Sequence, residues 1–261
     1  MYSGITQAAT PCSFDQKTPQ TLKMEDNPRT FADVQKTVLS CHKESTSEDK
    51  MSFYDSWSEL YEEDVMFLDY RAPLLAAESL AAVMRENRDQ ALVLDVACGT
   101  GLVALQLQRL GFRNFHGVDG SAGMLELARS KTVYQTLQKS MLDTDSLPAH
   151  SDSYDVVVIV GALSEGQVPH SILPELLRVT KPGGFVCMTT RSNTSNQLYK
   201  EQLQTVIEEM EQKTLWERVR VQEIEHWEKA TSVHEAEKNT EYISGIIYVY
   251  RKSKSQDKND N

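Results

Sequence analysis

The stretch Ala91-Leu-Val-Leu-Asp-Val-Ala-Cys-Gly-Thr-Gly101 decides the fold of this protein. Its first six residues are mostly apolar, which predicts a short strand buried on both faces. The Gly-x-Gly at its end predicts a tight turn in which the backbone approaches a ligand closely, and the helix that follows offers free N–H groups. The stretch therefore predicts a ligand site at the carboxyl end of a buried strand.

Outward from this stretch, apolar runs alternate with helical patterns. Helices are predicted at 102–110, 121–129 and 174–180, between strands at 91–96, 115–119, 134–142, 154–160 and 185–190. Repeated β-α-β units with right-handed crossovers make a parallel sheet with helices on both faces. A helix at 199–210 and two further strands at 218–227 and 242–251 follow. No helix separates these two strands, so we predict an α/β fold whose seven-stranded, mostly parallel sheet ends in an antiparallel hairpin.

The chain divides into one domain and two tails. Residues 1–28 are polar and contain three prolines, so they are predicted to be a disordered tail, and residues 252–261 form a charged tail. Between them we expect N-terminal helices within 29–85, a ligand-binding core at 90–190, and a C-terminal helix and hairpin at 195–251. Thr30 and Asp33 resemble a capping box that opens the first helix, and Glu44 to Lys50 is predicted to be a loop.

Composition excludes several classes of function. The chain has 27 Lys and Arg against 38 Asp and Glu, a formal net charge of −11, which argues against a nucleic-acid or anionic-membrane partner. No apolar run is long enough to span a membrane, and the start lacks the pattern of a signal peptide. The four cysteines show no metal-ligand spacing. We therefore expect an intracellular, cytoplasmic monomer without a metal, with the nucleus left open as a second location.

The glycine motif is typical of adenosine cofactors. Gly99-x-Gly101-x-x-Ala104 fits the dinucleotide fingerprint, and Asp119 stands 20 residues after Gly99, where a ribose-binding carboxylate is expected. This spacing alone does not separate NAD from other adenosine cofactors. Two features favour S-adenosylmethionine: Asp95 is predicted to point into the cleft, where a carboxylate suits an ammonium group, and the antiparallel hairpin differs from a fully parallel dinucleotide domain.

At these residues the sequence resembles the class I S-adenosylmethionine-dependent methyltransferases. Asp95 to Gly101 resembles their first motif, Gly117-Val-Asp-Gly-Ser121 with Met124 their ribose motif, and Lys181-Pro-Gly-Gly184 the turn before their fifth strand. The resemblance covers about residues 54–251 and implies a Rossmann-like fold. Further stretches resemble one subgroup of the family, which implies cofactor binding and no assigned acceptor: Phe53-Tyr-Asp-x-Trp57, Tyr70-Arg-Ala-Pro73, Ile159 to Ser164, Gly166 to Pro169 and Thr189-Thr-Arg-x-Asn193.

The resemblance also implies which residues bind the cofactor. It implies a glycine loop around the methionine and ribose, Asp119 on the ribose hydroxyls, Met124 against the adenine, Leu142 and Asp143 at the adenine amino group, and Gly161 beside the sulfonium. Tyr54, Tyr61 and Arg71 are expected to close over the cofactor. The full cofactor set is Asp95, Ala97, Cys98, Gly99, Gly101, Asp119, Gly120, Met124, Leu142, Asp143, Gly161, Tyr61 and Arg71.

Several of these residues have a structural alternative. Met124 could be ordinary core, because methionine fills gaps in many cores. Tyr54 and Tyr61 could be packing anchors, since aromatic residues at near-helical spacing usually are. Arg71 could form a surface ion pair, although its place at the start of a helix favours an anionic partner. Asp119 could cap the helix that follows Ser121.

The leading hypothesis is a methyltransferase that works by direct in-line displacement and leaves S-adenosylhomocysteine. Gly161-Ala-Leu-Ser164 stands in place of the Asn-Pro-Pro-aromatic motif found in family members that methylate the amino groups of nucleic acids and glutamine. We therefore expect a small molecule or a protein side chain as acceptor. Tyr54, Glu165, His170 and His226 are candidate acceptor-site residues, the last three as bases. A cofactor-binding interaction protein and an NAD-dependent oxidoreductase are the alternatives.

Overall fold

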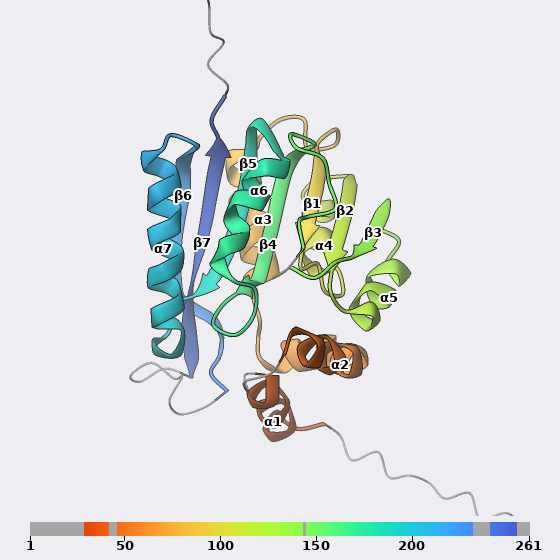
Figure 1. The fold of residues 1–261 in the computed structure, drawn as a ribbon. Helices are drawn as coiled ribbons and strands as arrows, with labels where there is room; N and C mark the ends of the chain where they lie inside the picture. The colour runs from red at the N-terminus through yellow and green to blue at the C-terminus, as the bar shows by residue number, and fades with distance from the viewer. Residues whose placement is uncertain (1–28, 42–45, 143–144, 232–240, 255–261) are drawn as a thin grey trace, which may run out of the picture.

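A computed structural model describes residues 29–41, 46–142, 145–231 and 241–254, and the Cys41 side chain falls outside this description. The predicted tails 1–28 and 255–261 also lie outside it, whereas residues 252–254 are described. The described residues contain one seven-stranded sheet in the order β3-β2-β1-β4-β5-β7-β6 (Figure 1). Its strands are β1 (Leu92–Val96), β2 (Asn114–Asp119), β3 (Thr136–Lys139), β4 (Tyr154–Leu163), β5 (Thr180–Arg191), β6 (Trp216–Lys229) and β7 (Tyr242–Lys252).

The pairing of the strands confirms the predicted fold class. β3, β2, β1, β4 and β5 are parallel, and β7 runs antiparallel to both β5 and β6. The final strand therefore lies between its hairpin partner and the parallel strands. Lys181-Pro-Gly-Gly184, predicted as a turn before a strand, lies within β5, where the register against β4 shifts between Tyr154 and Val156.

Helices cover both faces of the sheet (Figure 1). On one face, α3 (Ala72–Val83) and α4 (Leu102–Arg109) pack against alternate strand residues such as Val93 and Val158. On the other face, α6 (Leu173–Val179) and α7 (Gln197–Gln212) pack against Leu94, Val96 and their neighbours. Successive residues of each strand thus enter different cores, because side chains alternate between the faces of a sheet. α5 (Ala122–Ser130) lies beside β3, and the short helices η1 (His170–Ile172) and η2 (Thr194–Asn196) precede α6 and α7.

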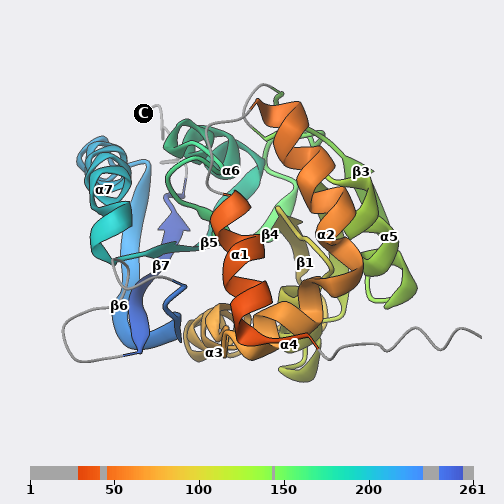
Figure 2. The same cartoon turned by 90° about the horizontal axis from the view of Figure 1, so that it is seen from below.

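Two N-terminal helices lie across the carboxyl ends of the parallel strands (Figure 2). α1 (Phe31–Cys41) begins after Thr30, whose backbone and side chain exchange hydrogen bonds with Asp33, as the capping-box prediction requires. α2 (Ser47–Phe67) begins after Thr46, which forms a second capping box with Asp49. The prediction of a loop from Glu44 to Lys50 is therefore wrong from Ser47 onward, where α2 begins. A threonine with an acidic residue three positions later forms a capping box, which favours the start of a helix.

The α2 helix is attached to the sheet layer through Asp55. One Asp55 carboxylate oxygen accepts hydrogen bonds from the Ser121 hydroxyl (2.5 Å) and from the Gly123 backbone N–H (2.9 Å), both at the start of α5. This contact holds α2 above the loops that follow β1 and β2. No helix within the described part of the chain is long and apolar enough to cross a membrane.

Candidate functional site

A cavity opens at the carboxyl ends of β1, β2 and β4, beneath α2. The loop after β1 supplies Ala97 and Gly99, the ends of β2 and β4 supply Asp119 and Gly161, and α2 supplies residues from above. The described residues that line it are Ser47, Lys50, Met51, Tyr54, Tyr61, Ala97, Gly99, Asp119, Gly120, Met124, Met141, Leu142, Val160, Gly161, Ala162, Gln167 and Val168. The cavity lies where open parallel sheets bind their ligands, outside the carboxyl ends of the strands.

The glycine loop after β1 presents one of its two glycines to the cavity. Gly99 has φ +54°, and a Cβ atom built on it would meet no atom within 4 Å. Gly101 has φ +92°, and a Cβ there would lie 3.0 Å from the Tyr134 ring. Gly101 is not among the described residues that line the cavity, so its role in cofactor binding stays a prediction. Gly101 is glycine because of the backbone angle and Tyr134, whereas Gly99 leaves room for a ligand.

The carboxylate of Asp119 is held toward the cavity by backbone amides. Its two oxygens accept hydrogen bonds from the N–H groups of Gly99 and Ser121, each at 2.8 Å. Burial raises the pKa of Asp119 from its ordinary value, against the lowering effect of these hydrogen bonds. Each carboxylate oxygen can accept a second hydrogen bond, so the group keeps acceptor capacity for a ligand. Ser121 itself caps α5 by accepting from the Met124 N–H, so the helix does not depend on Asp119 for its cap.

Asp95 does not point into the cleft. It is 1% exposed and shares the α3–α4 side of β1 with Val93, because its neighbours Leu94 and Val96 face the opposite core. One Asp95 oxygen accepts a hydrogen bond from the Tyr134 hydroxyl at 2.7 Å, and the other finds no partner among the described residues. Burial raises the pKa of Asp95 to about 7. The predicted contact of Asp95 with an ammonium group is thus contradicted, and the carboxyl is a buried group beneath the glycine loop.

The raised pKa of Asp95 makes stability depend on pH. Between about pH 4 and pH 7 the folded protein holds a proton that the unfolded chain releases, so the free energy of unfolding falls as the pH rises through this range. Asp95→Asn removes this contribution, which amounts to at most about 4 kcal/mol. Urea unfolding should therefore show the variant gaining stability relative to the native chain between pH 5 and pH 8. An equal difference at both pH values would contradict a raised pKa.

One end of the cavity is apolar and rich in sulfur. Met124 is 2% exposed yet lines the cavity, so it serves the core and the site at once. Gly120 brings its backbone against α2, because a Cβ on it would lie 2.4 Å from the Met51 sulfur. Met141 and Leu142 complete this end, which offers a flat ring a wall of methionine and leucine. Asp143, predicted at the adenine amino group, lies outside the described residues.

A second cavity meets the first at the end of β4. The two share Tyr54, Tyr61, Gly161 and Gln167, and the Tyr54 hydroxyl donates to the Gln167 side-chain oxygen at 3.1 Å. The second cavity continues between α2 and the ends of β5 and β6. Its remaining lining is Val38, Trp57, Val65, Leu68, Tyr70, Leu163, Ser164, Thr189, Thr190, Arg191, Trp227 and Glu228. Tyr54 and Tyr61 thus stand at the boundary of both cavities.

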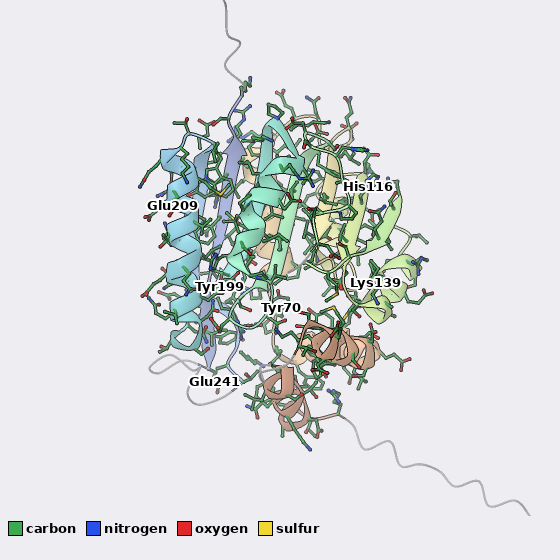
Figure 3. All side chains as sticks on the ribbon, viewed as in Figure 1. Tyr70, His116, Lys139, Tyr199, Glu209 and Glu241 are labelled. Atoms are coloured by element: carbon green, nitrogen blue, oxygen red, sulfur yellow. The ribbon has the colours of Figure 1, made fainter. Side chains whose placement is uncertain are left out.

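Sequence reasoning missed most of the second cavity. Tyr70, Gln167 and Trp227 were not selected as site residues, although the first two stand in stretches that resemble the family subgroup. Tyr70 directly precedes α3, and Figure 3 shows it between the sheet and the N-terminal helices. Trp227 belongs to β6 and is 1% exposed. The signal available in the sequence was the clustering of aromatic residues between 53 and 70.

Besides Asp95, five of the predicted site side chains line neither cavity. Arg71 binds the β6 backbone, where its guanidinium donates to the His226 carbonyl at 3.1 Å, so it does not close over the first cavity. Cys98 is buried beside Gly117, and burial raises the pKa of its thiol well above the ordinary value. His226 is exposed and packs its ring against Tyr242. Glu165 and His170 lie past the end of β4, His170 beside the Tyr199 ring.

The first cavity has the features that S-adenosylmethionine requires. Gly99 leaves an open cradle at a helix start, Asp119 offers acceptors for ribose hydroxyls, and Met124, Met141 and Leu142 offer an apolar wall for adenine. None of these features depends on Asp95. The residues that line the first cavity therefore fit this cofactor. The sequence argument from Asp95 does not hold, because Asp95 does not line the cavity.

Comparison with known proteins agrees with this geometry. Residues 94–188 match the methyltransferase domain family. Methyltransferase-like protein 27 of Homo sapiens is 48% identical over 185 residues, which are 71% of this chain and 75% of that protein. The ubiquinone/menaquinone biosynthesis C-methyltransferase of Desulfotalea psychrophila is 34% identical over 109 residues, 41% of this chain and 44% of that protein. A chain in the complex between the Haloferax volcanii Trm112 methyltransferase activator and a methyltransferase has a TM-score of 0.55 at 18% identity, with 77% of this chain and 97% of that chain covered.

Proposed function

The chain belongs to the class I S-adenosylmethionine-dependent methyltransferases, and from this premise we propose that it transfers a methyl group by direct in-line displacement to a small-molecule acceptor. The observation that carries the proposal is the meeting of the two cavities at Gly161. The first contains the glycine loop and Asp119, and the second is lined by different residues. A donor and an acceptor held in the two cavities would face one another across the end of β4.

In this proposal the first cavity binds the cofactor through residues of three strands. The Asp119 carboxylate accepts from the ribose hydroxyls, the Gly99 loop lies against the methionine and ribose, and Met124 with Leu142 covers the adenine. Gly161 turns the chain at the end of β4 with φ +77°, and its N–H donates to the Thr189 hydroxyl at 2.9 Å. That bond fixes the backbone at the point where the cavities meet.

The mechanism requires alignment more than acid–base chemistry. S-adenosylmethionine, when bound, supplies a methyl group on a positively charged sulfur, which is already an activated donor. The chain therefore needs to hold two molecules in line and exclude water, and such alignment can contribute roughly 7 to 11 kcal/mol to a reaction barrier. The α2 helix, attached by Asp55 and carrying Tyr54 and Tyr61, covers the junction of the cavities and supports this role.

Two measurements test the proposal against its alternatives. Isothermal titration calorimetry should give S-adenosylmethionine an affinity at least about a hundredfold higher than NAD, which the oxidoreductase alternative would reverse. Incubation with methyl-labelled S-adenosylmethionine and fractionated cell extract should then label a small molecule. Cofactor binding without transfer to any fraction would instead favour a protein whose work is interaction.

We further propose that residues 29–251 act as one methyltransferase domain and as a monomer, with a small molecule favoured over a protein side chain as acceptor. The acidic composition supports the absence of nucleic acid among its partners. The second cavity lies beneath α1 and α2, with Val38 of α1 in its lining, and this position supports a small acceptor.

A further inference from the structure

Five of the sixteen described residues that line the second cavity are aromatic, namely Tyr54, Trp57, Tyr61, Tyr70 and Trp227. Trp57 stacks on Tyr54 with ring centroids 5.9 Å apart and meets Tyr61 edge to face at 4.9 Å. The Trp227 ring packs on Gly245, where a Cβ would lie 2.3 Å from it. Aromatic rings therefore make up the largest side chains of the lining.

The aromatic rings are held in fixed positions. The Trp57 indole N–H donates to an Asp64 carboxylate oxygen at 2.7 Å, and Asp64 is fully buried. Arg29 also binds the Asp64 carboxylate, which neutralises it and ties the segment before α1 to α2. Trp227 is held by its burial beneath Gly245. Rings fixed in this way can recognise a ligand without first being ordered.

The Tyr70 hydroxyl lies at the junction with the first cavity. A Cβ built on Gly161 would lie 1.9 Å from the Tyr70 oxygen, so only glycine at this position leaves room for the hydroxyl. Within the described part of the chain, this hydroxyl forms no hydrogen bond. Burial raises the pKa of Tyr70 well above its ordinary value, so the group stays a neutral phenol that can donate or accept one hydrogen bond.

The charges on the cavity wall do not suit an acceptor, such as an alcohol, whose proton only a strong base removes. Among the described residues that line it, Arg191 and Glu228 are the charged ones, and their formal charges cancel. A carboxylate is far too weak a base to deprotonate an alcohol, and a neutral phenol is weaker still. The acceptor atom must therefore carry an available lone pair at neutral pH, as an amine, a thiolate or a carboxylate does.

The aromatic rings that line the second cavity favour one of these three nucleophiles, the amine. An uncharged amine that attacks a sulfonium takes over its positive charge, so one positive charge persists throughout the transfer, and aromatic faces attract cations. A thiolate or carboxylate would instead place a negative charge against the same faces. Burial also lowers the pKa of an ammonium ion, which releases the lone pair. The net charge of −11 favours the approach of cationic amines from solution.

We propose that the second cavity binds the methyl acceptor, that this acceptor is a small, largely apolar molecule with a primary or secondary amine, and that the Tyr70 hydroxyl positions the amine nitrogen. This inference rests on the proposed function. In the transfer, the nitrogen lone pair forms the new N–C bond as the C–S bond breaks and leaves its electron pair on sulfur. An amine that arrives as an ammonium ion first releases one proton to water, and after the transfer the methylated nitrogen carries the positive charge. The step therefore needs neither a side-chain base nor an oxidant.

Four probes that share one benzyl group test the acceptor class. Purified protein with labelled S-adenosylmethionine is offered benzylamine, benzyl alcohol, benzyl mercaptan or phenylacetate, after calorimetry has established that S-adenosylmethionine binds. We expect labelled N-methylbenzylamine and no comparable product from the other three. Preferential labelling of another probe, or S-adenosylmethionine binding without labelling of any probe, overturns the amine inference and leaves the proposed function standing. Failure of S-adenosylmethionine to bind would overturn the proposed function itself.

A tyrosine variant tests the positioning role of Tyr70. Tyr70→Phe should lower kcat for benzylamine by about tenfold, with a smaller change in KM and an unchanged affinity for S-adenosylmethionine. Tyr242→Phe is the matched control, because its hydroxyl bonds Asp69 outside the cavities, and it should behave like the native protein. The ratio kcat/KM should also level off at a lower pH with aniline than with benzylamine, because aniline is a weaker base. An unchanged kcat in Tyr70→Phe would contradict the positioning role.

Discussion

Replacing Asp119 with alanine is expected to weaken S-adenosylmethionine binding by about tenfold to a thousandfold, since hydrogen bonds from ligand hydroxyls to a carboxylate contribute roughly 1.5 to 3 kcal/mol each. The carboxylate lines the first cavity and is oriented by the Gly99 and Ser121 amides. Loss of the carboxylate removes both the acceptors and the contact that fixes the glycine loop.

Calorimetry of the Asp119→Ala variant should be paired with a melting curve and with Asp155→Ala as control. The Asp155 carboxylate also accepts a hydrogen bond from a backbone N–H, that of Leu92 at 2.9 Å, but it lines neither cavity, so its loss should cost about 1 kcal/mol of stability while affinity changes little. Analogues that lack one ribose hydroxyl should bind the native protein less well than the parent and bind Asp119→Ala equally well. Unchanged affinity in Asp119→Ala would show that the carboxylate serves only the loop and the helix.

Replacing Gly99 with alanine is expected to reduce S-adenosylmethionine affinity by roughly tenfold to a hundredfold, because the new methyl group would occupy ligand space. The protein itself leaves room for that methyl group, since no atom lies within 4 Å of the Cβ position. The left-handed backbone angle, φ +54°, adds a folding cost of about 1 to 2 kcal/mol. Binding should therefore suffer more than folding.

Gly166→Ala is a matched control, because Gly166 also has a left-handed backbone angle. Gly166 has φ +71° and open space around its Cβ position, yet it lines neither cavity. The two variants should lose similar melting temperature, and only Gly99→Ala should lose affinity in calorimetric titration. Equal affinities in the two variants would remove the glycine loop from the cofactor site. Gly101 is less informative, because a side chain there would press on Tyr134 and damage the fold.

The sheet was predictable because its signals are local. The apolar runs at 91–96 and 154–160 form β1 and β4, the latter extended to Leu163, and Ser121 caps α5 as expected. The antiparallel hairpin followed from two neighbouring strand patterns with no helix between them. Asp119 was also predictable, because the spacing from the glycine turn to the end of the second strand is fixed by one helix and one crossover.

The direction of individual side chains was harder to predict. Asp95 lies in a strand that is apolar on both faces, so the pattern does not reveal which face its carboxylate joins. The structure settles this by pairing it with Tyr134, which follows α5 and lies 39 positions later in the chain. Tyr134 also explains why residue 101 is a glycine, because a Cβ there would lie 3.0 Å from the Tyr134 ring. Arg71 was misplaced for a related reason, since its partner, the His226 carbonyl, lies on a strand 155 positions away.

The position of β7 between β5 and β6 has a consequence for the synthesis of the protein on the ribosome (Figure 1). This strand, the 11 residues Tyr242–Lys252, leaves the ribosome after every other strand of the sheet. Until β7 is made, β5 lacks the partner strand on its outer edge. β6 then lacks β7, which is its only partner among the described strands. A nascent chain therefore exposes unpaired strand edges, which readily join other chains. A premature stop codon shortly before Tyr242 would make that aggregation-prone state permanent, although every proposed cofactor-binding residue would already have been translated.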